Sequence, residues 1–195
     1  MATAQAEIVD RRTSIADAAL RVLEARGSKG LTHRAVDREA GLAEGSTSNY
    51  CRTRDALLTA ALQRLTELEQ PTIGAIEALL PYGPFEPRRA AELVWEQISV
   101  WLAPERIGFA VARTELWLEA RRRPEFSAAI DEVRREYLLR AERLLPAVGC
   151  TRPHDHAPQI LAALDGLMTN QIFQPATRLS SEQIVDHLER LFASC

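Results

Sequence analysis

The segment LTHRAVDREAGLAEGSTSNYCRTRDALL, residues 31–58, decides the fold of the first part of this chain. Thr32 is a good N-cap, and Gly41 stands where the helix that follows must end in a left-handed residue. The run from Gly45 to Tyr50 then predicts a short second helix with almost no bulk before the tyrosine. This order predicts a helix-turn-helix, in which the second helix is shaped to enter a DNA major groove.

The chain resembles the TetR (tetracycline repressor) family. The resemblance is most specific over roughly residues 11–58, where it is carried by Gly-Leu-Thr (30–32), Ala-Gly-Leu (40–42), Gly-Ser-Thr-Ser-Asn-Tyr (45–50) and Arg-Asp-Ala-Leu-Leu (54–58). The remainder resembles the family in length, helical pattern and the Leu-Asp-Gly-Leu segment at 164–167. Two positions depart from the common pattern: Ser48 stands where a tyrosine is usual, and Cys51 where a phenylalanine is usual.

The resemblance implies which side chains contact DNA. Phosphate contacts fall on Thr32, Tyr50 and Arg54. The side chains that face the bases are expected to be Ser46, Thr47 and Asn49. Asparagine can pair with adenine through two hydrogen bonds, and serine and threonine can reach either type of base.

Composition is that of an ordinary water-soluble protein. The chain has 195 residues, 46% hydrophobic content, 26% charged residues and a net charge of −3. Residues 1–58 hold nine Lys and Arg against eight Asp and Glu, so a phosphate-binding surface requires these cations to gather on one face. No signal peptide or membrane-spanning run is visible, and we expect a cytoplasmic protein with no membrane partner.

The cysteines and histidines do not predict a metal site. Cys51, Cys150 and Cys195 are widely spaced and form no C-x-x-C pair. His154 and His156 flank Asp155 in what the pattern indicates is a loop, and such short clusters are more often solvated. We therefore expect no metal and no cofactor.

The pattern along the chain predicts an all-α protein of about nine helices, without strands or repeats. We expect a DNA-binding domain over residues 1–52 and a helical ligand-binding and dimerisation domain over residues 53–195. The expected helices outside the helix-turn-helix span about 10–26, 53–71, 73–80, 88–102, 105–123, 125–145, 156–173 and 181 to the end. Gly27 is expected to stop the first of these, and Pro71 to kink or end the second.

Several side chains in the second part are candidates for contact with a small molecule. They are Trp95, Trp101, Phe109, Arg113, Trp117 and Asn170. Aromatic residues at helical spacing are more often core, and Arg113 and Asn170 are more often paired within the protein. A mainly apolar ligand, with an acidic or carbonyl group near Arg113, is nevertheless expected.

Two C-terminal helices are expected to form a homodimer interface, because the family dimerises through a four-helix bundle made from two such pairs. The helix around Gly166 is apolar on nearly every face, and the last helix is amphipathic. The residues assigned to this interface are Leu164, Gly166, Leu167, Leu188 and Leu191.

The sequence therefore predicts a homodimeric transcriptional regulator, a repressor released from a palindromic double-stranded operator by a small molecule. One alternative is a DNA-binding regulator that responds to no ligand. The alternative from another class is an all-α enzyme or carrier for a hydrophobic small molecule. No nucleophile–base pair, metal-ligand set or phosphate-binding loop is visible, so no enzymatic activity is expected.

Overall fold

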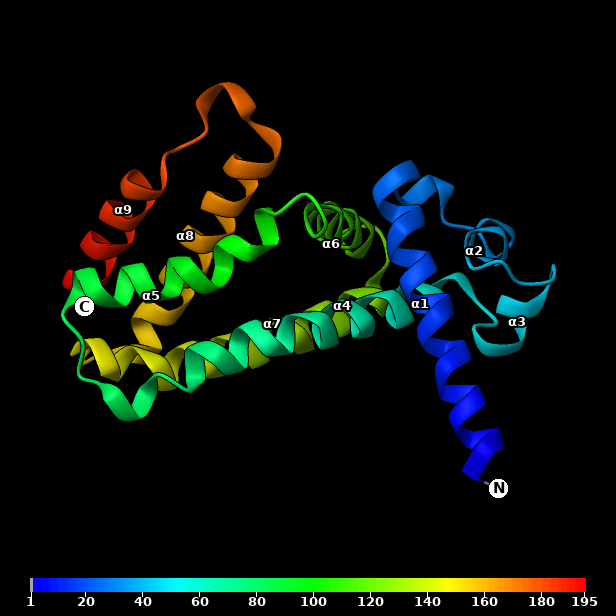
Figure 1. Ribbon diagram of the computed structural model, residues 1–195, viewed down its shortest axis with the longest axis horizontal. Coiled ribbons are helices and arrows are strands. Elements are labelled where there is room, and N and C mark those ends of the chain that lie inside the picture. Colours follow the sequence, from blue (N-terminus) through cyan, green and yellow to red (C-terminus); the bar gives the residue numbers. More distant parts are fainter. Residues whose placement is uncertain (1) are drawn as a thin grey trace. The chain divides into compact units, whose positions relative to one another are not determined.

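A computed structural model describes residues 2–195, with side chains from Asp10 onward. Over this range the chain is all-α, as the sequence predicts, with nine α-helices, four short 3-10 helices and no strand (Figure 1). The α-helices are α1 (Ala2–Gly30), α2 (His33–Glu39), α3 (Ser46–Tyr50), α4 (Arg54–Glu77), α5 (Pro87–Ser99), α6 (Ile107–Ala120), α7 (Pro124–Leu144), α8 (Pro153–Phe173) and α9 (Ser181–Ala193). The 3-10 helices are η1 (Leu80–Tyr82), η2 (Val100–Leu102), η3 (Leu145–Val148) and η4 (Pro175–Thr177). Among the helices described, none is long and apolar enough to cross a membrane.

The chain divides into two compact units. The first comprises residues up to Leu68 together with Glu105–Asp131, and the second comprises Glu69–Pro104 and Glu132–Cys195. Helices α4 and α7 therefore contribute to both units. The domain boundary expected after residue 52 was placed at the end of the sequence motif. The compact unit that contains the helix-turn-helix also includes α6.

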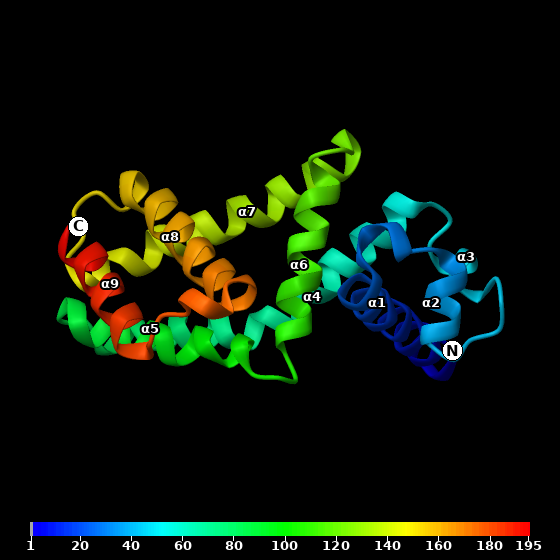
Figure 2. The same cartoon turned by 90° about the horizontal axis from the view of Figure 1, so that it is seen from above.

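The first unit is organised around the pairing of α1 with α6, which lie side by side (Figure 2). One apolar stripe of α1 is buried, with Ile15, Ala19 and Leu23 at most 1% exposed. Gly108 on α6 lies so close to α1 that an added Cβ would overlap the carboxylate of Glu24. A side chain at this position would require the exposed side chain of Glu24 to move away.

Gly27 interrupts α1 as the sequence predicts. Its φ of 63° is strained for any residue with a Cβ, and the backbone beyond it turns toward α2. The start of the helix differs from the expectation, because α1 begins at Ala2 instead of near Asp10.

Pro71 does not end its helix. The sequence predicts one helix up to Pro71 and another from Ile73, but α4 continues through the proline to Glu77. Pro71 is exposed, so water can solvate the carbonyl group that loses its amide partner there. The apolar periodicity on both sides of the proline then sustains a single helix.

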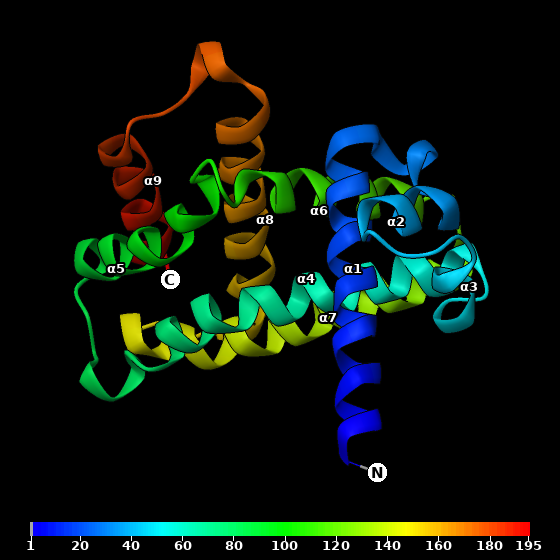
Figure 3. The ribbon, with the colours of Figure 1, turned by 45° about the vertical axis from the view of Figure 1, so that its right-hand side comes forward.

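The second unit is organised around the packing of α5 against α9 (Figure 3). A capping box begins α9: the Ser180 hydroxyl accepts from the Gln183 amide, and the Gln183 side chain accepts from the Ser180 amide. The apolar stripe of α9 is covered within the chain, with Ile184 and Leu188 both 0% exposed. Beside it, Arg88 on α5 donates to the Asp186 carboxylate at 2.6 Å.

Candidate nucleic-acid interface

The connection between α2 and α3 is fixed by one buried carboxylate. The two oxygens of Asp37, on α2, accept from the backbone amides of Gly45 at 2.8 Å and Thr47 at 2.7 Å, which lie at the start of α3. Burial of the carboxylate opposes its ionisation, but hydrogen bonds from Thr47 and Gly45 outweigh this effect and lower the pKa of Asp37. The Asp37 side chain is 3% exposed and caps the recognition helix.

Both ends of the helix-turn-helix are also held locally. The Thr32 hydroxyl accepts from the Ala35 amide at 3.1 Å, which confirms the predicted N-cap of α2. Gly41 has a φ of 67°, as its place after α2 requires. The imidazole of His33 donates to the carbonyl oxygen of Cys51 at 2.6 Å, so the end of α3 is tied to the start of α2.

The residues predicted to contact DNA fall into two groups. Thr32 and Asn49 are exposed, and Ser46 and Tyr50 are half-buried, so these four present polar atoms at or near the surface of the helix-turn-helix. Thr47 is 0% exposed, which corrects the expectation that its side chain faces a base. The five residues of α3 make little more than one turn, so one side chain must point into the core. Ser48, which the sequence reasoning did not assign to DNA, is exposed instead.

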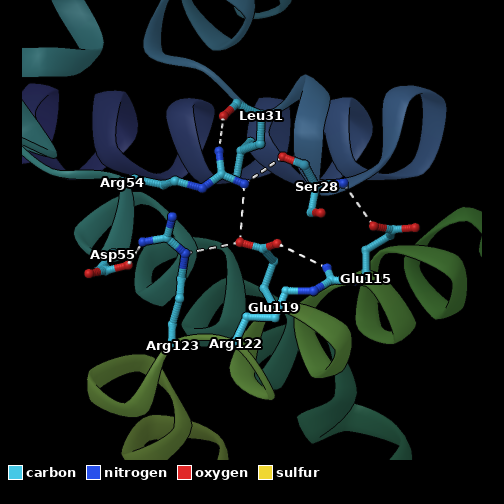
Figure 4. Close-up of polar contacts among 8 residues, drawn as sticks. All are labelled: Ser28, Leu31, Arg54, Asp55, Glu115, Glu119, Arg122 and Arg123. Atoms are coloured by element: carbon cyan, nitrogen blue, oxygen red, sulfur yellow. Dashed lines mark hydrogen bonds and ion pairs between the residues drawn. The ribbon is translucent and has the colours of Figure 1, made fainter.

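Arg54, the first residue of α4, joins three segments of the first unit (Figure 4). Its guanidinium donates to the carbonyl oxygens of Ser28, at 2.6 Å, and Leu31, at the end of α1 and just beyond it. It also donates to the Glu119 carboxylate on α6 at 3.2 Å. The predicted phosphate contact stays a prediction, and these bonds give Arg54 an anchoring role inside the protein.

Glu119 is the centre of this network. Its side chain is 9% exposed, and its carboxylate accepts from Arg123 at 3.1 Å as well as from Arg54. Arg123 extends the network to Asp55 on α4 at 2.8 Å, and Arg122 forms a longer ion pair with Glu119 at 3.5 Å (Figure 4). The network therefore connects α6 to the start of α4, which begins immediately after Thr53.

The charge of Glu119 is maintained by its partners. Burial alone would favour the neutral acid, but hydrogen bonds from Ser28, Arg54 and Arg123 more than compensate, so the pKa of Glu119 is lowered. A neighbouring carboxylate on α6, Glu115, accepts from the backbone amide of Ser28 at 2.8 Å. Two acidic residues of α6 thus bind the segment that leads into α2. Sequence reasoning did not find this network, because its members are separated by up to 95 positions in the chain.

The candidate ligand residues are divided between the two units. In the first unit, the Arg113 guanidinium lies 5.3 Å from the ring centroid of Trp117, which is 36% exposed, and Phe109 is half-buried. In the second unit, Trp95 and Trp101 are buried, and the Trp101 indole donates to the Thr72 hydroxyl at 3.2 Å.

Asn170, the last candidate ligand residue, lies on α8 and is half-buried. Its amide nitrogen donates to the Thr177 hydroxyl at 3.3 Å. Its Oδ1 atom is buried, and among the residues that the structure describes no donor reaches it. A buried carbonyl oxygen of this kind is suited to accept from a ligand or a water.

The residues assigned to the dimer interface differ in exposure. Gly166 is exposed, and Leu164 and Leu191 are half-buried. Leu167 and Leu188 are 7% and 0% exposed, so the structure corrects their assignment: they belong to the core of a single chain. The sequence showed an apolar stripe on α9 but not that α5 covers it.

A helix-turn-helix that presents a short second helix is typical of DNA-binding transcriptional regulators. Residues 85–194 match the family model described as "Tetracyclin repressor-like, C-terminal domain". The chain belongs to the TetR family. None of the curated proteins matches the chain significantly.

Solved structures agree with this assignment. A TetR family member from Streptomyces coelicolor A3 is 30% identical over 93% of this chain and 97% of its own, with a TM-score of 0.73. The multidrug binding protein EbrR, complexed with malachite green, is 30% identical with the same coverage and a TM-score of 0.71. A transcriptional regulator from Rhodococcus sp. Rha1 shares the fold, with 21% identity over 94% of each chain and a TM-score of 0.77.

Replacing Glu119 by glutamine is expected to lower the free energy of unfolding by about 1–3 kcal/mol at neutral pH, because two guanidinium groups lose a charged acceptor. The lowered pKa of Glu119 sets the sign of the pH effect. Its contribution is present above the unfolded-state pKa and is lost as the pH falls through the lower folded-state pKa. Urea unfolding at neutral and acidic pH should therefore show the gap between wild type and Glu119→Gln closing in acid.

The control is Glu67→Gln, since Glu67 pairs with Arg64 but its side chain is 63% exposed. It should change stability much less. Equal effects of the two substitutions would show that the Glu119 network does not stabilise the unit.

Proposed function

We propose that this protein is a homodimeric repressor that binds a palindromic DNA duplex in the cytoplasm and releases it when a small molecule binds. The observation that carries the proposal is the way in which α3 is held in place and exposed. A buried Asp37 holds the start of this helix, while Ser46, Ser48 and Asn49 offer short polar side chains that can come close to base edges. Tyr50 and Thr32 supply hydroxyl groups for phosphates.

Two cations beside α3 are further candidates for phosphate contact. Arg52 is exposed and follows α3 directly. Burial raises the pKa of the Cys51 thiol, and the positive charge of Arg12 partly offsets this effect, so Arg12 lies within electrostatic range of Cys51 at the end of α3. These two arginines give the recognition helix a basic border, whereas Arg54 is bound internally.

The DNA-binding proposal is tested with a duplex selected by the full chain from a randomised library. Asn49→Ala is expected to lose preference at one base position, at a cost of about 1–3 kcal/mol there. Arg52→Ala should weaken binding to all sequences alike and reduce the slope of log affinity against log salt by about 1. Fluorescence anisotropy with single-base variants of the duplex, over a series of salt concentrations, measures both effects.

Arg38→Ala is the matched control for Arg52, since Arg38 is an exposed arginine on α2. It should change the salt slope less. Failure to select any duplex, or an unchanged base preference in Asn49→Ala, would contradict the proposed interface.

The exposed face of α8 supports a dimer. Residues at positions 159, 162, 166, 169 and 173 are exposed and recur at helical spacing. Ala162, Gly166 and Thr169 are small, so a second helix can approach closely, and Phe173, 40% exposed, can cover apolar surface at one end. Together with Leu164 and Leu191 this face is our proposed contact between protomers.

Gly166→Leu tests the dimer directly. A Cβ at Gly166 meets no atom of the chain within 4 Å, and leucine is the better helix former, so the single chain tolerates the change. In a dimer the same side chain would force two helices apart. Sedimentation velocity should show dimer for wild type and monomer for Gly166→Leu.

Gly74→Leu on α4 is the control, because Gly74 is also helical, exposed and without neighbours within 4 Å. It should remain dimeric. Dimer persisting in Gly166→Leu would exclude this face of α8 as the interface.

Release of DNA requires that a ligand alter the first unit, and α6 is suited to transmit the change. It carries Arg113 and Trp117, and through Glu119 it is bound to the segments on either side of the helix-turn-helix. We propose that ligand binding shifts α6 and α4 and thereby changes the separation of the two recognition helices in the dimer. The ligand must bind the released state more tightly, since equal affinity would shift nothing.

We propose a mainly apolar, cationic aromatic molecule as the effector, in place of the ligand with an acidic or carbonyl group near Arg113 that the sequence suggested. EbrR, 30% identical to this chain, has been solved with malachite green and with ethidium, and both dyes are aromatic cations. In the second unit of this chain Glu69 is 8% exposed and accepts a hydrogen bond from the Tyr137 hydroxyl. This pair offers a negative charge and an aromatic ring to such a ligand.

Titration calorimetry with malachite green tests the effector class on the protein alone. Glu69→Gln keeps the shape of the side chain and removes its charge, so the dissociation constant should rise about tenfold or more. Glu77→Gln is the control on the same helix, because Glu77 is paired with Arg140 and Arg143. No binding of the dye, or equal affinity in both variants, would contradict the proposal and favour a regulator that responds to no ligand of this kind.

A further inference from the structure

Three side chains that can ligate metals meet in the second unit, outside the surfaces described above. Cys150 follows η3, His156 lies in the first turn of α8, and Cys195 follows α9. Their ligand atoms all lie within 4.8 Å of one another. The Nδ1 atom of His156 is 3.3 Å from the Cys150 sulfur and 3.0 Å from the Cys195 sulfur.

These separations are close to those of a tetrahedral site. Zinc lies about 2.3 Å from a cysteine sulfur and 2.0–2.1 Å from a histidine nitrogen. For tetrahedral angles this places sulfur and nitrogen ligands about 3.6 Å apart. Each sulfur would have to move outward by only about half an ångström to admit the ion.

The surroundings favour a partly enclosed site. Cys150 and His156 are 6% and 9% exposed, so two ligands are fixed in the packed interior. Cys195 is half-buried, which leaves an entry path from solvent. The backbone reaches Cys150 through Gly149, whose φ of 81° brings the chain sharply round after η3.

One contact must change when a metal binds. Arg152 donates to the Nε2 atom of His156 at 3.2 Å, so the proton of the neutral imidazole lies on Nδ1 and points at the sulfurs. Metal binding at Nδ1 moves that proton to Nε2, and Arg152 must then turn away. The Arg152 side chain is 66% exposed and pairs with Asp155 only at 3.9 Å, so it is able to move.

We propose that Cys150, His156 and Cys195 form a binding site for a soft divalent cation of the zinc class, with water as the fourth ligand. Both thiols release their protons to solvent on binding, and two thiolates balance the charge of the ion. The bound ion links the end of α9 to the start of α8. Since α8 carries the proposed dimer face, occupancy of the site would stabilise the unit on which dimerisation depends.

Cobalt(II) is the probe for this site. The full chain, reduced and kept free of oxygen, should bind one equivalent and develop sulfur-to-cobalt charge-transfer bands with the visible bands of tetrahedral cobalt. Cys195→Ser and His156→Gln should weaken binding at least tenfold and reduce or remove these bands. Zinc should displace the cobalt and raise the melting temperature of wild type but not of Cys195→Ser.

The chain offers a matched control for each ligand type. Cys51→Ser removes a buried cysteine of the first unit, and His154→Gln removes an exposed histidine two residues from His156. Both should bind cobalt as wild type does. Arg152→Gln should bind more tightly, because it removes the competing donor to Nε2.

Circular dichroism verifies that each variant is folded, and Cys195→Ser is the least disturbing of them because Cys195 is half-buried. Absence of charge-transfer bands in wild type, or bands unchanged in both Cys195→Ser and His156→Gln, would overturn the proposal. A Cys150–Cys195 disulfide found by mass spectrometry after exposure to air, without cobalt binding under reducing conditions, would also overturn it and identify a thiol pair instead.

Discussion

The carboxylate of Glu119 is the constraint on which the first unit depends. It is nearly excluded from water, and a buried charge is tolerated only when it is paired and hydrogen-bonded. Arg54 and Arg123 supply that pairing, and each arginine has a further acceptor in Leu31 or Asp55. Separating these ions would leave a buried charge without a partner, which costs free energy. The pairing therefore holds α6, the start of α4 and the end of α1 together. The helix-turn-helix is therefore joined to α6 by polar contacts with a required geometry.

The recognition helix shows the same reliance on contacts outside itself. With five residues, α3 is far too short to be stable alone in water. It is stabilised by contacts with the rest of the unit: Asp37 caps its start, and the side chain of Thr47 is buried in the core. His33 binds the carbonyl oxygen of Cys51, just beyond its end. The residues on its outward face are not needed to stabilise the helix, so they can be small and polar. This division between an inner and an outer face suits a helix that must approach DNA closely.

In the second unit, the two C-terminal helices have different roles. α9 turns its apolar stripe inward against α5, while α8 leaves a row of small residues exposed. The cluster of Cys150, His156 and Cys195 lies where the ends of α8 and α9 meet. Residues that stabilise the unit and residues that could contact a partner therefore lie on different faces of the helices; they are not divided between one helix and the other.

The sequence by itself determined the features that depend on neighbouring residues. The all-α class, the Thr32 N-cap, the interruption of the first helix at Gly27 and the left-handed conformation of Gly41 were predicted, because local backbone chemistry sets them. The sequence did not predict that α4 would continue past Pro71 to Glu77, because the cost of one proline is smaller than the gain from continuing the helix.

Only the tertiary structure decided which partner each side chain meets. Asp37, Thr47 and Leu188 have sequence patterns compatible with either an inward or an outward position. Asp37 and Thr47 are buried because α2 and α3 pack together, and Leu188 because α5, far away in the sequence, packs against α9. Glu119 with Arg54, and Cys150 with Cys195, are pairs that no local spacing reveals. Helical periodicity shows whether one face of a helix is apolar or polar. Which other helix covers that face depends on how segments far apart in the sequence pack together. For that reason the fold class could be derived from sequence, and the polar networks that fix its function could not.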